Sequence, residues 1–291
     1  MTALGAREAA DAKGSSPRRS HRRAWILAAV LGALLVVTPV ARQAWSYGNS
    51  RSSTLTGGSD GRPVGALEIV GGDANVTVSP RADHEVGYRA VVSWSLKAPV
   101  IEESWLGDTL RLTPHCPGGG FWLTGGGGCT VELGVSVPTD LPVKVTAGSG
   151  RVSLSGLTGP VDAQVDSGRI EATGLRGALR AEVASGRLRA TDLASPQVDL
   201  RVGSGAAHAA FVAPPDQVTG QVGSGSLTLT VPAATRFRVH CEAGAGRCEV
   251  PDALRDAGSP RGLTLRAASG RAQASYPAGA GAGAGPDWRQ P

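Results

Sequence analysis

The chain is poor in the residues that fill large globular cores. Aromatic residues make up 4% of its 291 residues and there is one methionine, whereas glycine contributes 42 residues and proline 19. Glycine and proline weaken helices and strand interiors and favour turns. This composition argues against the core of a globular α/β enzyme and favours a chain with many turns.

Most of the chain also lacks an excess of charge. The net charge is +5, but residues 1–42 hold seven Arg or Lys and two Asp or Glu, which accounts for the whole excess. The remaining 249 residues carry 22 charges of each sign. Nucleic-acid-binding domains carry a basic footprint. The balance of charges therefore predicts that nucleic acid is not a partner.

What the sequence does contain is a repeat in its second half. A Ser-Gly or Ala-Gly pair recurs seven times, at spacings of 18, 18, 19, 20, 21 and 24 residues. Positions seven, five and three before each glycine, and two and four after it, are Ala, Val, Ile, Leu or Cys in 34 of 35 cases, Gly220 being the exception. The glycines are Gly150, Gly168, Gly186, Gly205, Gly225, Gly246 and Gly270. Alternation with period two predicts strands with one buried face, and the longer period predicts stacked repeats.

One straight strand cannot bury both flanks of a Ser-Gly pair. The buried positions jump by five residues across the pair, so a bend or bulge is expected at the glycine. The predicted fold is all-β: a β-solenoid of stacked two-strand repeats, with an N-terminal β cap and a preceding single transmembrane helix. A plain antiparallel meander is the alternative.

The repeated serines do not predict a nucleophile. Six of them occupy equivalent positions, whereas catalysis needs one, and no partner histidine recurs. They are Ser149, Ser167, Ser185, Ser204, Ser224 and Ser269. A hydroxyl that satisfies backbone groups at a corner explains all six.

The outward positions do not predict a glycosidase either. In register they form two columns, in which acids alternate with other residues. One column holds Asp162, Arg180, Asp199, Thr219, His240 and Thr264, and the other Gln164, Glu182, Arg201, Gln221, Glu242 and Arg266. Glycoside hydrolysis needs two neighbouring carboxyl groups. No catalytic residue, metal site or cofactor is expected, and we interpret the chain as a non-enzyme.

The N-terminus carries the one long apolar run. Residues 25–41 are 17 residues without a charge, near the lower limit for a membrane-spanning helix. Four arginines precede the run and only Arg42 follows closely, which places the N-terminus in the cytoplasm and the rest outside. We expect a single-pass anchor in the cell membrane over residues 24–42. A cleaved signal peptide is the alternative.

The four cysteines form two local pairs. Cys116 and Cys129 bracket a glycine-rich loop, and Cys241 and Cys248 occupy buried positions on the two sides of the Gly246 corner. An even count in an exported domain predicts two disulfides. A metal site in which His115 or His240 joins a cysteine pair is the alternative.

The loop between Cys116 and Cys129 has an apolar tip. Phe121 and Trp122 lie among glycines, and no GK[ST] sequence or strand–loop–helix context indicates a phosphate-binding loop. The tip either packs on the sheet or meets a partner. Phe121 and Trp122 are the candidate partner contacts.

These features divide the chain into six segments. They are a cytoplasmic tail (1–23), the transmembrane anchor (24–42), a flexible linker (43–62), an N-terminal β region (63–141), the β-repeat solenoid (142–276) and a low-complexity, disordered tail (277–291). The opening of the N-terminal region, with Leu67, Ile69 and Val76 around Gly72, fits the repeat template in degenerate form.

The repeats resemble the bacterial putative-adhesin family, a domain of unknown function built of β-strand repeats. The resemblance rests on Val137-Pro138 before the first unit, the recurring Ser-Gly-x-[Val/Ile/Leu] and the Leu-x-Gly corners, and it spans Ala66 to Tyr276. It implies a surface-exposed, non-catalytic β-repeat domain and supplies no catalytic residues.

Three functions are compatible with the sequence. The first is a non-catalytic, membrane-anchored extracytoplasmic protein of the cell envelope, adhesin-like or binding an envelope protein or polysaccharide. The second is an envelope-stress sensor or regulatory subunit that reports through its cytoplasmic tail. The third, the least favoured, is a carbohydrate-active β-solenoid enzyme.

Overall fold

A computed structural model describes residues 26–33, 51–95, 97–117 and 129–277. Residues 26–33 are helical, and within the described ranges no helix has the length and apolar character needed to cross a membrane. The expected cytoplasmic tail, most of the expected anchor and nearly all of the expected C-terminal tail lie outside these ranges.

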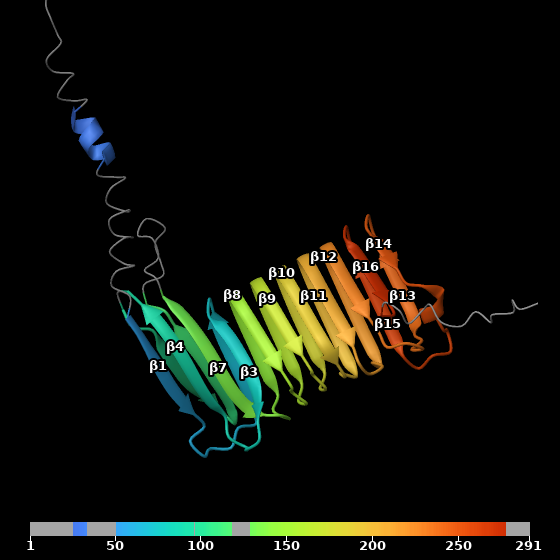
Figure 1. Cartoon of the computed structure of the whole chain (residues 1–291), viewed down its shortest axis with the longest axis horizontal. Helices are drawn as coiled ribbons and strands as arrows, with labels where there is room; N and C mark the ends of the chain where they lie inside the picture. Colours follow the sequence, from blue (N-terminus) through green and yellow to red (C-terminus); the bar gives the residue numbers. More distant parts are fainter. Residues whose placement is uncertain (1–25, 34–50, 96, 118–128, 278–291) are drawn as a thin grey trace, which may run out of the picture.

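The fold is all-β, as predicted from the repeat. Sixteen strands form one open, mixed sheet, and a short 3-10 helix, η2 (Asp252–Leu254), follows β14. Figure 1 shows the strands side by side in an elongated body, with the N-terminal strands at one end and the C-terminal strands at the other.

Five parallel strands make up the centre of the sheet. They are β8 (Val143–Ser155), β9 (Val161–Thr173), β10 (Leu179–Leu193), β11 (Gln197–Phe211) and β12 (Gln217–Thr230). Each pairs with the next in register, so the corner glycines Gly150, Gly168, Gly186, Gly205 and Gly225 align across the sheet. Because consecutive strands are parallel, the antiparallel meander is excluded.

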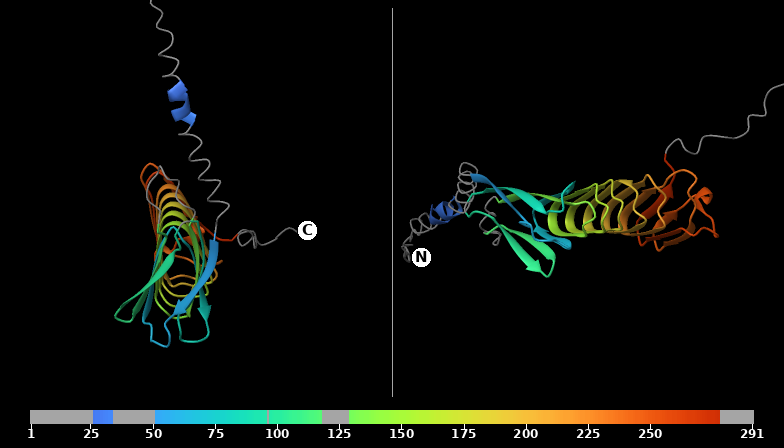
Figure 2. Two further views of the ribbon diagram at one scale, coloured as in Figure 1. Left: turned by 90° about the vertical axis from the view of Figure 1, so that its left-hand side faces the viewer. Right: turned by 90° about the horizontal axis from the view of Figure 1, so that it is seen from below.

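Each central strand bends at its Ser-Gly corner, and the buried side changes there as predicted. In β9 the side chains of Val161, Ala163 and Val165 are buried before the corner, and those of Ile170 and Ala172 after it. The two halves of a strand face each other across a narrow interior (Figure 2). This packing also explains why position 220, the exception in the sequence pattern, is a glycine.

At Gly220 the interior is already filled by leucine side chains. A Cβ atom built there would lie 2.4 Å from Leu227 Cδ2 and 2.9 Å from Leu265 Cδ2. Leu227 belongs to the second half of the same strand, β12. The interior therefore remains filled with apolar side chains although position 220 contributes none.

The corner glycines are required by close stacking as well as by the bend. A Cβ atom on Gly186 would lie 2.0 Å from the carbonyl oxygen of Gly168, and one on Gly205 would lie 1.9 Å from that of Gly186. Backbones at this spacing leave no room for a side chain that points along the stack. The aligned glycines form a continuous ladder at one edge of the interior.

At the N-terminal end the order of the strands in space departs from their order in the chain. Strands β2 (Ala66–Gly72) and β3 (Asn75–Arg81) pair with the first and second halves of β8. Strands β6 (Thr109–His115) and β7 (Thr130–Pro138) then pair, also in parallel, with the far sides of β2 and β3. The β2/β3 unit thus lies between β6/β7 and β8, and it confirms the degenerate repeat expected around Gly72.

Antiparallel strands finish this end. Strand β5 (Val100–Leu106) pairs with β6, β4 (Gly87–Trp94) pairs with β7, and β1 (Arg51–Gly58) pairs with β4. The sequence predicted a flexible linker over residues 43–62. The structure differs over residues 51–58, because their backbone groups are paired in a strand.

The C-terminal end shows the same departure from chain order. Strands β15 (Gly262–Ala267) and β16 (Arg271–Ser275) pair with the two halves of β12. Strands β13 (Arg238–Ala243) and β14 (Arg247–Glu249) pair with the far sides of β15 and β16. The Gly270 unit, last in the chain, therefore lies between the Gly225 and Gly246 units.

Candidate functional site

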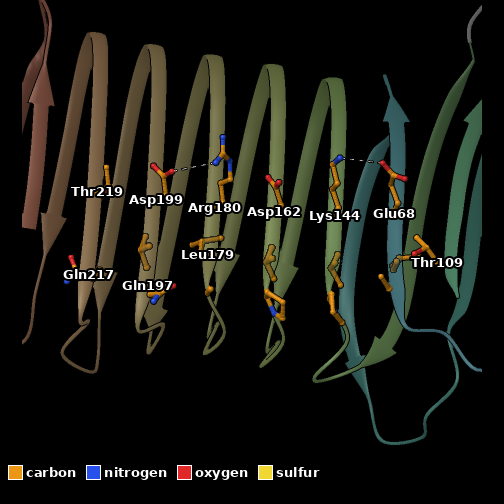
Figure 3. A pocket seen from close by; sticks show the side chains of 18 residues that line it. Glu68, Thr109, Lys144, Asp162, Leu179, Arg180, Gln197, Asp199, Gln217 and Thr219 are labelled. Atoms are coloured by element: carbon orange, nitrogen blue, oxygen red, sulfur yellow. Dashed lines mark ion pairs between the residues drawn. The ribbon is translucent and has the colours of Figure 1, made fainter. Parts of the chain in front are cut away.

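A groove crosses the starts of seven neighbouring strands. It has a volume of about 640 Å³ and runs from β6 through β2 and β8 to β12. At ~4.8 Å per strand, this path is about 29 Å long. Its floor is formed by the first buried residue of five of these strands, which are Leu67, Val143, Val161, Leu179 and Val198. Its walls are formed by the outward residues on either side (Figure 3).

One wall is a column of side chains with alternating charge. In register order the column runs through Arg111, Glu68, Lys144, Asp162, Arg180, Asp199 and Thr219, and all of these except Arg111 line the groove. The parallel register places each of these residues directly beside the next. Opposite charges in such cross-strand positions attract each other.

Ion pairs hold parts of this column. Arg111 Nη2 lies 2.7 Å from Glu68 Oε2, and Lys144 Nζ lies 3.6 Å from Glu68 Oε1. The hydrogen bond from Arg111 holds the pKa of the Glu68 carboxyl below its usual range, against the opposite effect of partial burial. Glu68 is therefore ionised at neutral pH.

A second network lies further along the groove wall. Arg201 Nη2 lies 3.0 Å from Asp199 Oδ2, and Arg180 Nη1 lies 3.8 Å from the same atom. The other oxygen, Asp199 Oδ1, is buried without a hydrogen-bond donor among the described residues. A buried acceptor without a donor is costly, so the ion pairs of Asp199 Oδ2 have to offset the burial of this oxygen.

The opposite wall of the groove is uncharged. It is formed by the residues directly before the first buried position of each strand, which are Ala66, Pro142, Pro160 and Ala178, and then Gln197 and Gln217. The small apolar residues occupy one end and the amides the other. The groove can thus pack against an extended chain and hydrogen-bond to it along its length.

The sequence predicted the two outward columns, and the structure confirms their register with one change of order. Thr264 lies beside Thr219, and His240 lies beyond Thr264 at the end of the sheet, because β15 is inserted before β13. Sequence reasoning missed Glu68 and Lys144. Lys144 follows Val143 as Asp162 follows Val161, so the same repeat spacing would have identified it.

Both predicted disulfides are present. Cys116 pairs with Cys129 at a Cα–Cα distance of 6.1 Å, and Cys241 pairs with Cys248 at 5.9 Å. The first closes the loop between β6 and β7, and the second joins the two halves of the β13/β14 unit. Each disulfide lies in an end unit: β6/β7 is next to the inserted β2/β3 unit, and β13/β14 is next to the inserted β15/β16 unit.

The alternative metal sites are not assembled. The sulfur atoms are bonded to each other, and His115 and His240 are paired through Nε2 with Glu102 and Glu242 at 2.9 and 2.7 Å. Within the described ranges no three His, Cys, Asp or Glu side chains converge as metal ligands do. Phe121 and Trp122, the predicted partner contacts, lie outside those ranges.

Comparisons with known proteins give only distant likenesses. No protein-family model matches the sequence, and a search of curated proteins finds no relative. Among solved structures, the chain is similar to a putative cell adhesion protein from Clostridium sporogenes, with 12% identity over 78% of this chain and 100% of that one and a TM-score of 0.33.

Two further solved structures are similar at the same level. A putative lipid binding protein from Parabacteroides distasonis shares 12% identity over 78% of this chain and 97% of its own, with a TM-score of 0.40. A putative adhesin from Bacteroides fragilis shares 10% identity over 77% and 97%, with a TM-score of 0.34. These values are too low to transfer a ligand or an activity.

Proposed function

We propose that the chain is a non-catalytic, membrane-anchored β-solenoid of the bacterial cell envelope, which binds an extended, overall neutral polysaccharide along the groove. The observation that carries this proposal is the groove itself, about 29 Å long at ~4.8 Å per strand, with charges that alternate in sign along one wall. A site of this shape fits a linear ligand better than a compact one.

The alternating charges support a neutral ligand. Neighbouring positive and negative groups largely satisfy each other, so they attract neither a polyanion nor a polycation. The amides of Gln197 and Gln217 and the hydroxyl of Thr219 are suited to the hydroxyl groups of sugars.

A solenoid interpretation is supported by three features of the central strands. Their neighbours are parallel and in register, each bends at a glycine, and the two halves of each enclose one apolar interior. On this view each repeat is one turn of a coil, and the groove runs parallel to the coil axis.

The groove is tested by filling it. Ala178→Trp places an indole against the groove wall directly before β10, whereas Ala184→Trp places one on an exposed position of β10 outside the groove. Retention of an isolated envelope polysaccharide fraction by the purified full chain is measured for both. We expect a loss of at least about tenfold for Ala178→Trp and almost none for Ala184→Trp. Equal retention by the two variants would reject the groove as the binding site.

The anchor is tested separately by fractionation. A C-terminally tagged chain should sediment with membranes, and deletion of residues 24–42 should release it. Recovery of a shortened, soluble wild-type protein in the medium would show cleavage and reject the anchored form. The groove test is read independently of this result.

A further inference from the structure

A ladder of arginines lies on the second half of the central strands, next to the glycine corners. Arg151, Arg169 and Arg187 directly follow Gly150, Gly168 and Gly186, and strand register places them side by side on β8, β9 and β10. At ~4.8 Å per strand, the three Cα positions span about 10 Å. The three side chains project outward, with Arg151 54% exposed and Arg169 38% exposed.

Like charges in neighbouring cross-strand positions repel each other. In the groove wall the same strands place Lys144, Asp162 and Arg180 at equivalent neighbouring positions, so the charges there compensate. In the arginine ladder they do not. The same strands can thus carry side chains of alternating charge, as in the groove wall, but in the arginine ladder they carry only positive charge.

Acidic partners only partly compensate the ladder. Glu171 lies 3.7 Å from Arg151 Nε and 3.7 Å from Arg169 Nη1. Arg187 has no carboxylate within ion-pair distance among the described residues, and its neighbours at the next positions are Arg189 on its own strand and Ala206 on β11. The end of the ladder at β10 therefore has a net positive charge.

A second groove, of about 750 Å³, lies between the ladder and the glycine corners. It is lined by the three arginines, by Asn75 and Ala206, and by the corner glycines of β8 to β11; no carboxylate lines it. Because the glycines have no side chains, a ligand can approach the backbone closely while it contacts the guanidinium groups.

We infer that this groove is a binding site for a linear polysaccharide that carries a carboxylate on each sugar. Guanidinium groups bind carboxylates through paired, charge-assisted hydrogen bonds. The ladder is about as long as a few sugar units of an extended glycan, so more than one of its guanidinium groups can pair with carboxylates of the same chain. The site is separate from the groove assigned to a neutral ligand and does not depend on it.

The test uses polygalacturonate as the probe and the purified full chain as the protein. Arg169→Gln/Arg187→Gln removes two ladder charges. Arg247→Gln/Arg271→Gln removes two charges from the equivalent positions of the C-terminal units, outside both grooves, and is the matched control. We expect the dissociation constant for polygalacturonate to rise at least about tenfold in the ladder variant and less than about twofold in the control. Binding should weaken as salt is added.

The assignment would be overturned by absence of polygalacturonate binding by the wild-type chain or by equal losses in the two variants. Tighter ladder-dependent binding of single-stranded DNA than of polygalacturonate would also overturn it. Neutral dextran should not compete, and competition by it would also count against the site. The ladder variant should melt at the same temperature as wild type or higher, because repulsion is relieved. A lower melting temperature would indicate a structural role instead.

Discussion

Substitution of Gly186 by alanine should disrupt the centre of the sheet. The added Cβ would lie 2.0 Å from Gly168 O, whereas ordinary contact begins at 3.4 Å, so the two strands would have to part by about 1.4 Å from a spacing of ~4.8 Å. Overpacking of this kind costs about 1–3 kcal/mol. The backbone φ of +143° adds strain of about 1–3 kcal/mol. The expected loss of unfolding free energy is therefore about 2–6 kcal/mol.

Gly174→Ala is the matched control, because it separates backbone strain from overlap. Gly174 also has a positive φ, +66°, but the nearest atom to its Cβ position lies 4.0 Å away. Only the conformational cost of about 1–2 kcal/mol applies. Equilibrium urea unfolding of both variants, followed by circular dichroism, gives the comparison. Equal destabilisation would refute the argument that close stacking, and not the bend alone, requires glycine at the corner.

The remaining predictions concern the interior, a disulfide and pH. Val183→Asp should lower the unfolding free energy by several kcal/mol, because an unpaired carboxylate enters a dry interior. Glu182→Gln, at the adjacent outward position, should lower it by less than about 1 kcal/mol. Similar melting temperatures for the two variants would contradict the assigned register. Cys248→Ser should lower the unfolding free energy by about 2–3 kcal/mol, since it opens the bond to Cys241; an unchanged melting temperature in non-reducing buffer would show that the bond contributes nothing. Arg111 lowers the pKa of Glu68 in the folded state. The Glu68 carboxylate therefore contributes its full stabilisation above its unfolded pKa, near 4.5, and this contribution is lost as the pH falls through the lowered, folded-state pKa. Glu68→Gln should therefore destabilise the protein in urea at neutral pH and converge with wild type in acid, and a difference that persists at low pH would exclude this cause.

The interior register and the bends could be predicted because they are local properties of the sequence. Period-two alternation sets which residues face inward, and the odd jump across each Ser-Gly pair requires a bend there. Cys241 and Cys248 could be paired for the same reason, since both fall on buried positions that flank one corner. Gly220 could not be explained, because the leucines that fill its place reach it across the bend of its own strand (Leu227) and from the inserted strand β15 (Leu265).

The order of the end units could not be predicted from repeat spacing. Spacing identifies the residues that face inward, but every unit offers similar edges, so it does not determine which units become neighbours. The Gly246 and Gly270 units follow each other in sequence, yet the later one pairs with β12.

The arginine ladder was missed for a different reason. Arg follows the corner glycine in five of the seven units, a signal that is visible in the sequence. The total charge of the segment after residue 42 is nevertheless zero. A sum over the whole segment cannot detect charges that register brings into one column.

At each end of the sheet a unit is inserted out of chain order, so the molecule can be lengthened by a repeat only at its centre. The end units depend on particular neighbours that arrive out of chain order, whereas β9 to β11 each have the same kind of neighbour on both sides. Duplication of residues 161–178 would add one strand between two existing equivalents and leave both ends intact. Each such event would lengthen the molecule and both of its grooves by ~4.8 Å, so the span of the protein and the length of chain that either groove can accommodate would grow together.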